Sequence, residues 1–501
     1  MTKTLYTADA VYFFAYYPNF AILDIYSAYI LSMISYQNER IHFIGVGGAS
    51  MSALAKFVIE KGGSVTGSDR EKSIVTNELE KLFPVYYGET PWIVDGCTKI
   101  VYSSAISSDN LELKRAIDLG IPVLERHEFL GDISKKFQKT VAVAGAHGKT
   151  TVTAMIAHAM KKLDANFSAH IGGETEYGNL ILSGEDFFVT EACEYKKSLL
   201  SLFPYISIVL NIELDHPDCY DTIESLVTVY LAFLEKGEIQ IFPANLLDTC
   251  KNEHISIYEY EKMSYALKCV EKVGDMSKDD VIVFSNGKMV IWSKNNRGFA
   301  DENPHIVICK NHDTYFEIDM VDNDPIASQN TLVCLAVLDL LGYNLGDVAE
   351  TLKSFKGVKR RKEFVGRLDG ASVVFDYAHH PTQIRGIISS FEGRSLVVFQ
   401  PHTYTRTQAY FDDFVSALSL ADRLIIMDTY GAREGAIEGA DSMALARQIS
   451  TKIAKERVEY IKSTSKTIEY VISKGKHYDN ILFLGAGDIY LLKDKLAPYL
   501  K

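Results

Sequence analysis

Residues 141–153, VAVAGAHGKTTVT, constrain the fold of this chain more than any other stretch. An apolar run typical of a buried strand leads into a tight glycine-containing turn, and helix-forming sequence follows. Such a turn points backbone N–H groups and the positive end of the helix dipole at an anion. Lys149 is suited to contact the β- and γ-phosphates of a nucleotide, and Thr150 to hold Mg²⁺. Val143 stands where a standard phosphate loop has its first glycine, so a chance turn stays open as the alternative.

Short apolar runs that alternate with helical sequence recur along the chain. Strands are expected at 41–45, 65–68, 100–105, 121–125, 187–190, 206–210, 373–376, 396–400, 424–428 and 481–487. With 501 residues, the chain is expected to form several domains. The alternation predicts an α/β fold of three domains, each built on a mainly parallel sheet. We expect a Rossmann-like domain at 39–135, a central P-loop ATPase-type domain at 136–357 and a second Rossmann-like domain at 358–501.

Charge and cysteine content exclude some classes of partner and compartment. The formal net charge is −13 without a basic block, which argues against a nucleic-acid partner. The seven cysteines include no C-x-x-C pair, so a reducing cytoplasm fits better than a disulfide or zinc framework. The protein is therefore expected to be cytoplasmic.

The N-terminal segment, residues 1–38, is of uncertain status. Residues 11–36 are rich in aromatic side chains and long enough to span a membrane, but Pro18 and Asp24 interrupt them. Stable membrane insertion is therefore not expected. An extension packed on the protein, a true start at Met33 and membrane association stay open as interpretations.

The first strand ends in a second glycine turn, with Gly45, Gly47 and Gly48. The next strand ends at Ser68 and Asp69, where an acidic residue about 20 positions after such a turn can meet a ribose hydroxyl. This placement favours a nucleotide-type ligand, with a plain strand–helix turn as the alternative.

Carboxylates follow two expected strands of the central domain. Glu191 ends the first of these strands, and NIELDHPD at 211–218 follows the second. Mg²⁺ prefers oxygen ligands, so Glu191 is the first choice as a ligand. His216 is either a further ligand, a residue that positions water, or a helix-start residue bonded to Asp215 or Asp218.

The third domain also carries polar segments near its expected strands. GVKRR at 357–361 is a local basic cluster that suits phosphate, although such a run is usually a solvated turn. DYAHHP at 376–381 and FQPHTYTRT at 399–407 follow strands. Polar loops at the strand ends of three α/β units imply a site assembled between domains.

Together these segments resemble the Mur ligase family of ATP-dependent cell-wall peptide synthetases, from about residue 41 to the C-terminus. The matching segments, in family order, are GVGGASM (45–51), SSAISSDN (103–110), GAHGKTT (145–151), NIELDHPDCY (211–220), GVKRR, DYAHHP and FQPHTYTRT. FQPHTYTRT and YAHHP favour the branch that adds one amino acid over the related enzyme that recycles a tripeptide.

The resemblance implies a ligase for peptidoglycan precursor synthesis, with ATP and Mg²⁺ as cofactors. A carboxylate of UDP-N-acetylmuramate would attack the γ-phosphate of ATP, giving an acyl phosphate and ADP. The amino group of L-alanine would then displace phosphate. Because the reactants of the first step are anions, catalysis rests on charge neutralisation and positioning. The protein is expected to act as a monomer or homodimer.

The resemblance also assigns residues. Catalytic roles fall to Lys149, His216, Arg360 and Arg361. ATP would be bound by Gly145, Ala146, His147, Gly148, Lys149, Thr150, Thr151, Asn330 and Asp376. The metal would be held by Thr150, Glu191 and His216. The sugar nucleotide would be bound by Gly45, Gly47, Gly48, Ser68, Asp69, Ser103 and Ser104. The amino acid would be bound by Tyr377, His379, His402 and Arg406.

Two departures from the family pattern bear on function. Thr403 stands where the family usually has an arginine, which removes a positive group from the amino-acid end and leaves glycine or serine open beside L-alanine. Cys193 replaces a usual acid, and with Cys219 it places thiols near the expected metal positions. We hypothesise that thiol alkylation inactivates the enzyme, while simple space-filling is the alternative.

Two further functions stay open. A different amide ligase on this scaffold, such as a folate or polyglutamate ligase, would have no reason to keep GVGGASM or FQPHTYTRT. A non-catalytic UDP-sugar-binding homologue predicts loss of Lys149, Glu191 or His216, and the sequence retains all three.

Overall fold

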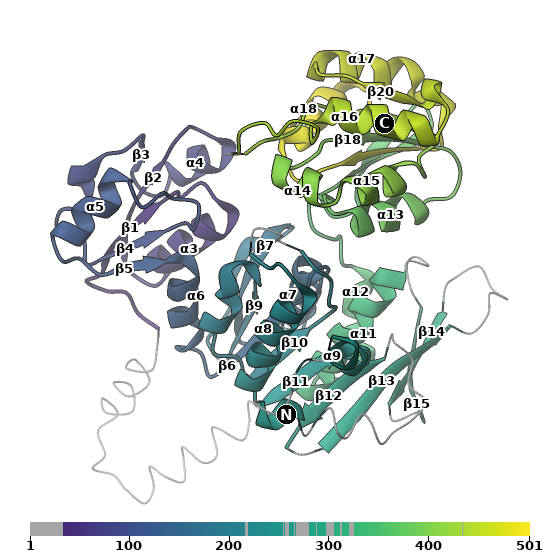
Figure 1. Cartoon of the computed structure of the whole chain (residues 1–501). Coiled ribbons are helices and arrows are strands. Elements are labelled where there is room, and N and C mark those ends of the chain that lie inside the picture. Colours follow the sequence, from purple (N-terminus) through teal and green to yellow (C-terminus); the bar gives the residue numbers. More distant parts are fainter. Residues whose placement is uncertain are drawn as a thin grey trace, which may run out of the picture.

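The computed structural model describes residues 34–501, except for residues 216–218, 254, 256–259, 265, 267–279, 287, 297–304, 311–312, 320–324 and 433. Three sheets organise the chain into a first, a central and a C-terminal domain (Figure 1). The predicted fold class is confirmed, because each sheet has a parallel core with helices packed against it.

The first domain holds a parallel sheet of five strands in the order β3-β2-β1-β4-β5. Its central strand β1 carries the apolar IHFI run, with Ile41 and Phe43 fully buried. The strands are β1 Arg40–Ile44, β2 Ser64–Asp69, β3 Val85–Tyr87, β4 Lys99–Tyr102 and β5 Val123–Glu125. The helices are α3 Ala49–Glu60, α4 Ile74–Leu79, α5 Leu111–Asp118 and α6 Arg126–Ser134.

The central domain holds a sheet of ten strands, of which β7, β9, β6, β10 and β11 form a parallel core. Antiparallel strands extend it at both edges, β8 on one side and β12 to β15 on the other, which sequence reasoning did not predict. The strands are β6 Lys139–Ala144, β7 Phe167–Thr175, β8 Gly178–Leu182, β9 Phe187–Glu191, β10 Ile206–Val209, β11 Ile239–Pro243, β12 Val281–Ser285, β13 Lys288–Asn296, β14 His305–Lys310 and β15 Asp313–Asp319. The helices are α7 Lys149–Lys162, α8 Ile223–Lys236, α9 Leu246–Asn252, α11 Pro325–Leu340 and α12 Leu345–Lys353.

The C-terminal domain holds a sheet of six strands in the order β16-β17-β21-β18-β19-β20, parallel except for β16. The strands are β16 Glu363–Leu368, β17 Ala371–Asp376, β18 Ser395–Phe399, β19 Arg423–Ile426, β20 Val458–Tyr460 and β21 Asn480–Leu484. The helices are α13 Pro381–Ser389, α14 Tyr404–Ala409, α15 Phe411–Leu418, α16 Ser442–Lys452, α17 Thr464–Lys474 and α18 Leu492–Leu496.

The described end of the N-terminal segment packs on the protein. Ile34 and Tyr36 are buried, and the Tyr36 ring meets the Phe57 ring of α3 edge-on at 6.0 Å. Residues 1–33, and with them the hypotheses of a start at Met33 and of membrane association, lie outside the described residues. Within the described part of the chain, no helix is long and apolar enough to cross a membrane.

Candidate active site

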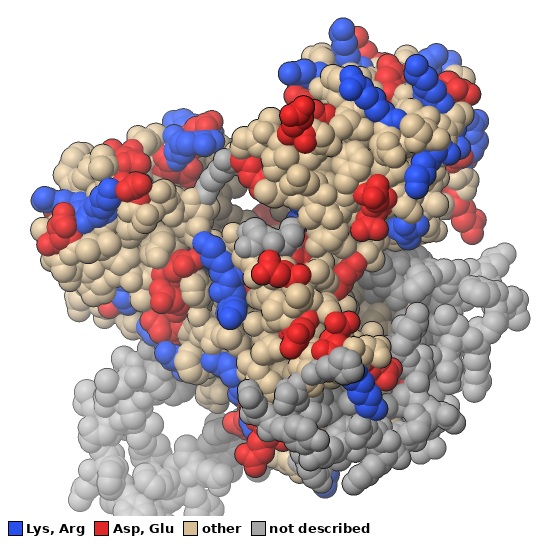
Figure 2. Space-filling view, in the orientation of Figure 1, with Lys and Arg blue, Asp and Glu red and all other residues tan. Residues whose placement is uncertain are grey.

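A cleft of about 1060 Å³ lies where the three domains meet, and the surface is hollowed there (Figure 2). The central domain contributes the phosphate loop, Glu191 and Glu194 to its walls. The C-terminal domain contributes basic and histidine side chains, and the first domain reaches the cleft through Ala49, Ser52 and Lys56 of α3. The site expected between domains is therefore a physical cavity.

The phosphate loop joins β6 to α7, as its sequence predicts. Gly145 and Gly148 have φ angles of 131° and 86°, in the region that favours glycine. Gly148 is the residue before α7, so the first N–H groups of that helix open toward the cleft. A Cβ atom on Gly148 would stand 2.9 Å from Oδ1 of Asn330, which puts α11 directly beside the loop.

Lys149 points back into its own loop and against a buried carboxylate. Its Nζ donates to the carbonyl of Gly145 at 2.5 Å and to both carboxylate oxygens of Glu194 at 3.0 Å. Burial by itself lowers the pKa of Lys149, but Glu194 outweighs it and raises that pKa above its usual value. The loop therefore carries a permanent positive charge. Sequence reasoning missed Glu194 as the partner that holds it.

Thr150 and Glu191 both line the cleft near the loop at 172–173. Glu191 ends β9, and its Oε1 accepts a hydrogen bond from the Gly172 N–H at 2.6 Å. A Cβ on Gly173 would stand 3.0 Å from the Thr150 side chain. A carboxylate and a hydroxyl beside a phosphate loop form an oxygen donor set of the kind that suits Mg²⁺. His216, the third expected ligand, lies outside the described residues.

The residues expected to bind the sugar nucleotide gather at the carboxyl ends of β1, β2 and β4, next to the described lining of the cleft. Gly45 has a φ of 81°, and a Cβ on it would stand 3.3 Å from the Ser103 side chain. The Gly47 N–H donates to the Asp69 carboxylate at 2.8 Å. Ser104 follows β4, and Gly48 precedes α3.

Ser68 turns its hydroxyl away from this glycine turn. The hydroxyl donates to the fully buried Glu112 carboxylate at 2.5 Å, and His42 Nε2 lies 3.3 Å away. The backbone carbonyl of Ser68 accepts hydrogen bonds from the N–H groups of Gly45 and Val46. Ser68 therefore contacts the turn through its backbone.

The basic cluster of the C-terminal domain faces the cleft. The guanidinium groups of Arg360 and Arg361 each lie 4.7 Å from the centre of the Tyr377 ring. Arg360 also donates to the carbonyls of Ala486 and Gly487. Asp376 accepts the backbone N–H groups of Lys362 and Ala378, at 2.6 and 2.7 Å, and burial raises its pKa. Arg360 is therefore anchored beside an aromatic ring within reach of the cavity.

The residues expected at the amino-acid end lie together. The rings of His379 and His402 are 5.9 Å apart, and both line the cleft. Burial, followed by the nearby Arg406 charge, lowers the pKa of His402 to about 4 and that of His379 well below its usual value. Both rings are therefore neutral near pH 7. Arg406 is buried and donates to the Asp215 carboxylate at 2.8 Å.

Thr403 and Cys193 also line the cleft. Thr403 has a φ of 65° and ψ of 147°, a strained conformation for a β-branched residue. Burial raises the pKa of the Cys193 thiol, which slows its reaction with alkylating agents. The alkylation hypothesis stays a prediction.

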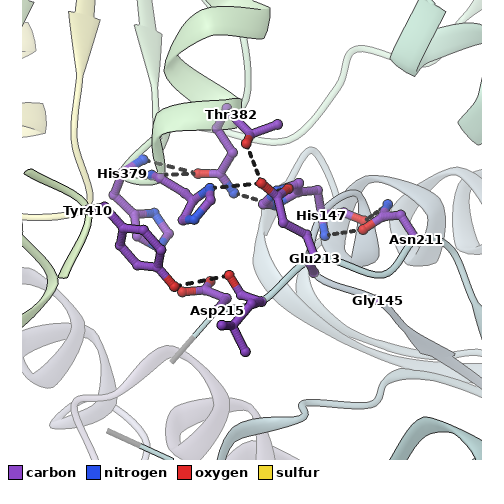
Figure 3. Close-up of polar contacts among 12 residues, drawn as sticks. Gly145, His147, Asn211, Glu213, Asp215, His379, Thr382 and Tyr410 are labelled. Carbon is purple, nitrogen blue, oxygen red and sulfur yellow. Dashed lines mark hydrogen bonds and ion pairs between the residues drawn. The ribbon is translucent and has the colours of Figure 1, made fainter. Parts of the chain in front are cut away.

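Residues 211–215, which follow β10, join the phosphate loop to the C-terminal domain (Figure 3). The sequence marks this segment by its carboxylates but does not predict its partners in the C-terminal domain. Thr382 of α13 contacts Glu213, and its neighbour Gln383 contacts His147 of the phosphate loop; neither residue had a sequence signal.

Comparison with known proteins identifies the family. "Mur ligase family, catalytic domain" matches residues 40–138, "Mur ligase middle domain" matches 143–306, and "Mur ligase, glutamate ligase domain" matches 360–487. The UDP-N-acetylmuramate–L-alanine ligase of Clostridium kluyveri is 35% identical over 467 residues, covering 91% of this chain and 97% of the relative. The enzyme of that name from Acetivibrio thermocellus is 35% identical over 480 residues, covering 91% and 96%.

Solved structures agree with these relatives. The UDP-N-acetylmuramate–alanine ligase MurC of Thermotoga maritima superposes with a TM-score of 0.71 at 25% identity, covering 92% of this chain and 98% of that one. The murein peptide ligase of Psychrobacter arcticus shares the fold, with a TM-score of 0.62 at 19% identity, covering 92% and 98%. The chain belongs to the Mur ligase family.

Proposed function

We infer that this chain is an ATP-dependent ligase that joins L-alanine to the carboxylate of UDP-N-acetylmuramate in peptidoglycan precursor synthesis. The observation that carries this inference is one cavity lined by both the Lys149 phosphate loop and the basic C-terminal segments. Relatives that match over nine-tenths of the chain and bear the name of this activity support it.

The first step of the reaction brings together two anions, the sugar-nucleotide carboxylate and ATP, and the amine reacts only in the second step. The sugar-nucleotide carboxylate attacks the γ-phosphate of ATP, giving ADP and an acyl phosphate. The L-alanine amino group then attacks the acyl carbon, and phosphate leaves. Positive groups that face the transferring phosphoryl group lower the first barrier. We assign this role to Lys149, and to Arg360 and Arg361 across the cleft.

We propose Mg²⁺ as the cofactor, held by Thr150 and Glu191 with His216 as a further ligand. The oxygen donors of Thr150 and Glu191, and the place of these two residues at the cleft wall, support this assignment. When bound, the ion would offset charge on the ATP phosphates. Further ATP contacts are assigned to Gly145, Ala146, His147, Gly148, Thr151, Asn330 and Asp376.

The other substrates are assigned to the two flanking domains. We propose that the sugar nucleotide binds at Gly45, Gly47, Gly48, Ser68, Asp69, Ser103 and Ser104. We propose that the amino acid binds at Tyr377, His379, His402 and Arg406, where a planar guanidinium can grip an α-carboxylate. We further propose a cytoplasmic monomer or homodimer, in keeping with the cysteine pattern.

The second candidate is the same ligase acting on glycine or serine. Thr403 favours it, because this residue lines the cleft where the family usually has an arginine.

The test is phosphate release from ATP and Mg²⁺ with UDP-N-acetylmuramate and L-alanine, glycine or serine in turn. We expect release that requires the sugar nucleotide, the metal and L-alanine together. Preference for glycine or serine would establish the second candidate. No release with any of the three, from folded protein that binds the sugar nucleotide, would contradict the ligase assignment.

A further inference from the structure

Residues 211–215, here called the bridge segment, hold the backbone of the phosphate loop. The His147 N–H donates to Asn211 Oδ1 at 2.9 Å, and Asn211 Nδ2 donates to the His147 carbonyl at 2.9 Å (Figure 3). This two-point contact fixes where the His147 ring emerges from the loop.

Two domains converge on the carboxylate of Glu213. From the phosphate loop, His147 Nε2 lies 2.6 Å from Glu213 Oε2. From the C-terminal domain, the Thr382 hydroxyl donates to Oε1, and His380 Nδ1 lies 3.4 Å from the same oxygen. The Glu213 side chain is 28% exposed, so these contacts are partly shielded from water. Hydrogen bonding to His147 and Thr382 opposes the effect of burial and keeps the pKa of Glu213 below its usual value.

The hydrogen bonds of Gln383 fix the tautomer of His147. Gln383 Oε1 accepts the N–H groups of His379 and His380, at 3.0 and 3.3 Å. Its Nε2 must then be the donor to His147 Nδ1, at 2.8 Å. Because Nδ1 accepts, the proton of a neutral His147 ring lies on Nε2 and is donated to Glu213.

The spacing of these groups also resembles a metal site, because ligand atoms of His147, Glu213 and His380 lie within 4.8 Å of one another. A metal ion, however, needs the lone pair of a ring nitrogen. The Nε2 atom of His147 carries the proton and so has no free lone pair for a metal. Moving the proton to Nδ1 would break the hydrogen bond that Nδ1 accepts from Gln383. The geometry therefore favours a hydrogen-bonded clasp over metal coordination.

The bridge segment continues to the amino-acid end of the cleft. The Leu214 carbonyl accepts from the Tyr410 hydroxyl at 3.0 Å, and Asp215 pairs with Arg406 at 2.8 Å. One short segment thus contacts the phosphate loop, α13, α14 and Tyr410, the residue between α14 and α15.

We propose that Glu213 is a positioning residue that clasps the phosphate loop to the C-terminal domain, so that the acyl phosphate and the amino acid meet in the closed cleft. This proposal rests on the proposed ligase function. Glu213 is not part of the cleft lining; it acts through His147 and Thr382.

The test compares Glu213→Gln with Thr382→Val, which removes the partner hydroxyl from an exposed position on the other domain. Glu350→Gln, an exposed glutamate of α12 paired with Lys353, is the matched control. We expect kcat to fall about tenfold in Glu213→Gln, the scale of hydrogen bonds to a charged group, with the Kd of ATP within about twofold of wild type. In Thr382→Val we expect a smaller fall in kcat. In the double variant we expect kcat to fall by less than the product of the two single-variant factors, because both changes break the same contact.

Hydrogen–deuterium exchange gives a readout without turnover. With a non-hydrolysable ATP analogue and UDP-N-acetylmuramate bound, we expect the backbone amides of residues 379, 380 and 382–384 to exchange faster in Glu213→Gln than in wild type or Glu350→Gln. The proposal would be overturned if Glu213→Gln exchanged at the wild-type rate and kept the wild-type kcat. It would also be overturned if the fall in kcat of the double variant equalled the product of the two single falls. If Zn²⁺ raised the Tm of wild type but not that of Glu213→Gln, the cluster would be a metal site and the proposal would be overturned. Failure of the ligase function would instead show as absent wild-type turnover with every amino acid.

Discussion

Two glycine turns, 45–48 in the first domain and 145–148 in the central domain, join a buried strand to a helix in the same way. Both begin with a glycine at positive φ. At the first turn a carboxylate, Asp69, already accepts the Gly47 N–H. At the second turn an ammonium group, Lys149, is held in the loop by Glu194.

The backbone supplies N–H donors at both turns, and we propose that the neighbouring side chains decide which ligand each turn binds. An acceptor at the first turn suits sugar hydroxyl groups, which donate hydrogen bonds. A cation at the second suits a polyphosphate. Each of the following changes removes one element of this contrast.

The largest effect is expected for Lys149→Ala, which removes the cation at the phosphate loop. We expect kcat to fall by about 10²–10³, the scale for one group that stabilises charge in a transition state. Steady-state phosphate release measures it. Lys162→Ala, at the exposed end of the same helix, is the control. A kcat within a few fold of wild type would remove Lys149 from the chemistry.

A second change, Glu194→Gln, removes the partner of that cation. The nucleotide-free protein should lose about 2 kcal/mol, because a buried ammonium group loses a charged acceptor. The phosphates of ATP restore a partner, so ATP should raise Tm more in this variant than in wild type. Equal ATP-induced shifts in Tm would show that Glu194 does not hold Lys149 in solution.

At the first turn, Asp69→Ala should raise the KM of the sugar nucleotide about tenfold and leave the KM of ATP unchanged. Asp118→Ala, an exposed acid of the same domain, serves as the control. An unchanged KM of the sugar nucleotide would break the contrast between the two turns.

The smallest effect is a pH dependence beside the first turn. His170 is buried with Nε2 2.9 Å from the Ser50 hydroxyl, and burial lowers its pKa from 6.5 to about 3. The unfolded chain therefore binds this proton first, and the stability contributed by neutral His170 is lost as pH falls below 6.5 toward 3. At pH 6.0 the expected loss is below about 1 kcal/mol. His170→Asn should show a smaller fall in Tm between pH 7.5 and 6.0; an equal fall would contradict this prediction.

Most strands of the parallel cores and both turns could be predicted because their determinants are local, although β3, β7, β11 and β20 were not among the expected strands. Apolar runs such as IHFI and VAVA mark buried strands, and glycines mark the turns. The antiparallel β13, KMVIWSKNN, mixes polar and apolar residues and gave no such signal. Its place depends on pairing with neighbouring strands.

The interdomain contacts lay beyond sequence reasoning for a different reason. Glu213 and Thr382 are 169 positions apart, and Asp215 and Arg406 are 191 apart. Pairing across such separations depends on how finished domains pack, which no local pattern encodes. Arg406, expected at the amino-acid end with His402, has a partner in Asp215 that sequence reasoning missed.

The most direct test of the account is to measure the binding of ATP and of UDP-N-acetylmuramate separately to Lys149→Ala and Asp69→Ala by calorimetry. We predict that Lys149→Ala weakens ATP at least tenfold and leaves the sugar nucleotide within about twofold of wild type, and that Asp69→Ala does the reverse. The assignment of one substrate to each turn would be contradicted if either folded variant lost affinity for both ligands. It would also be contradicted if Lys149→Ala lost only the sugar nucleotide and Asp69→Ala lost only ATP.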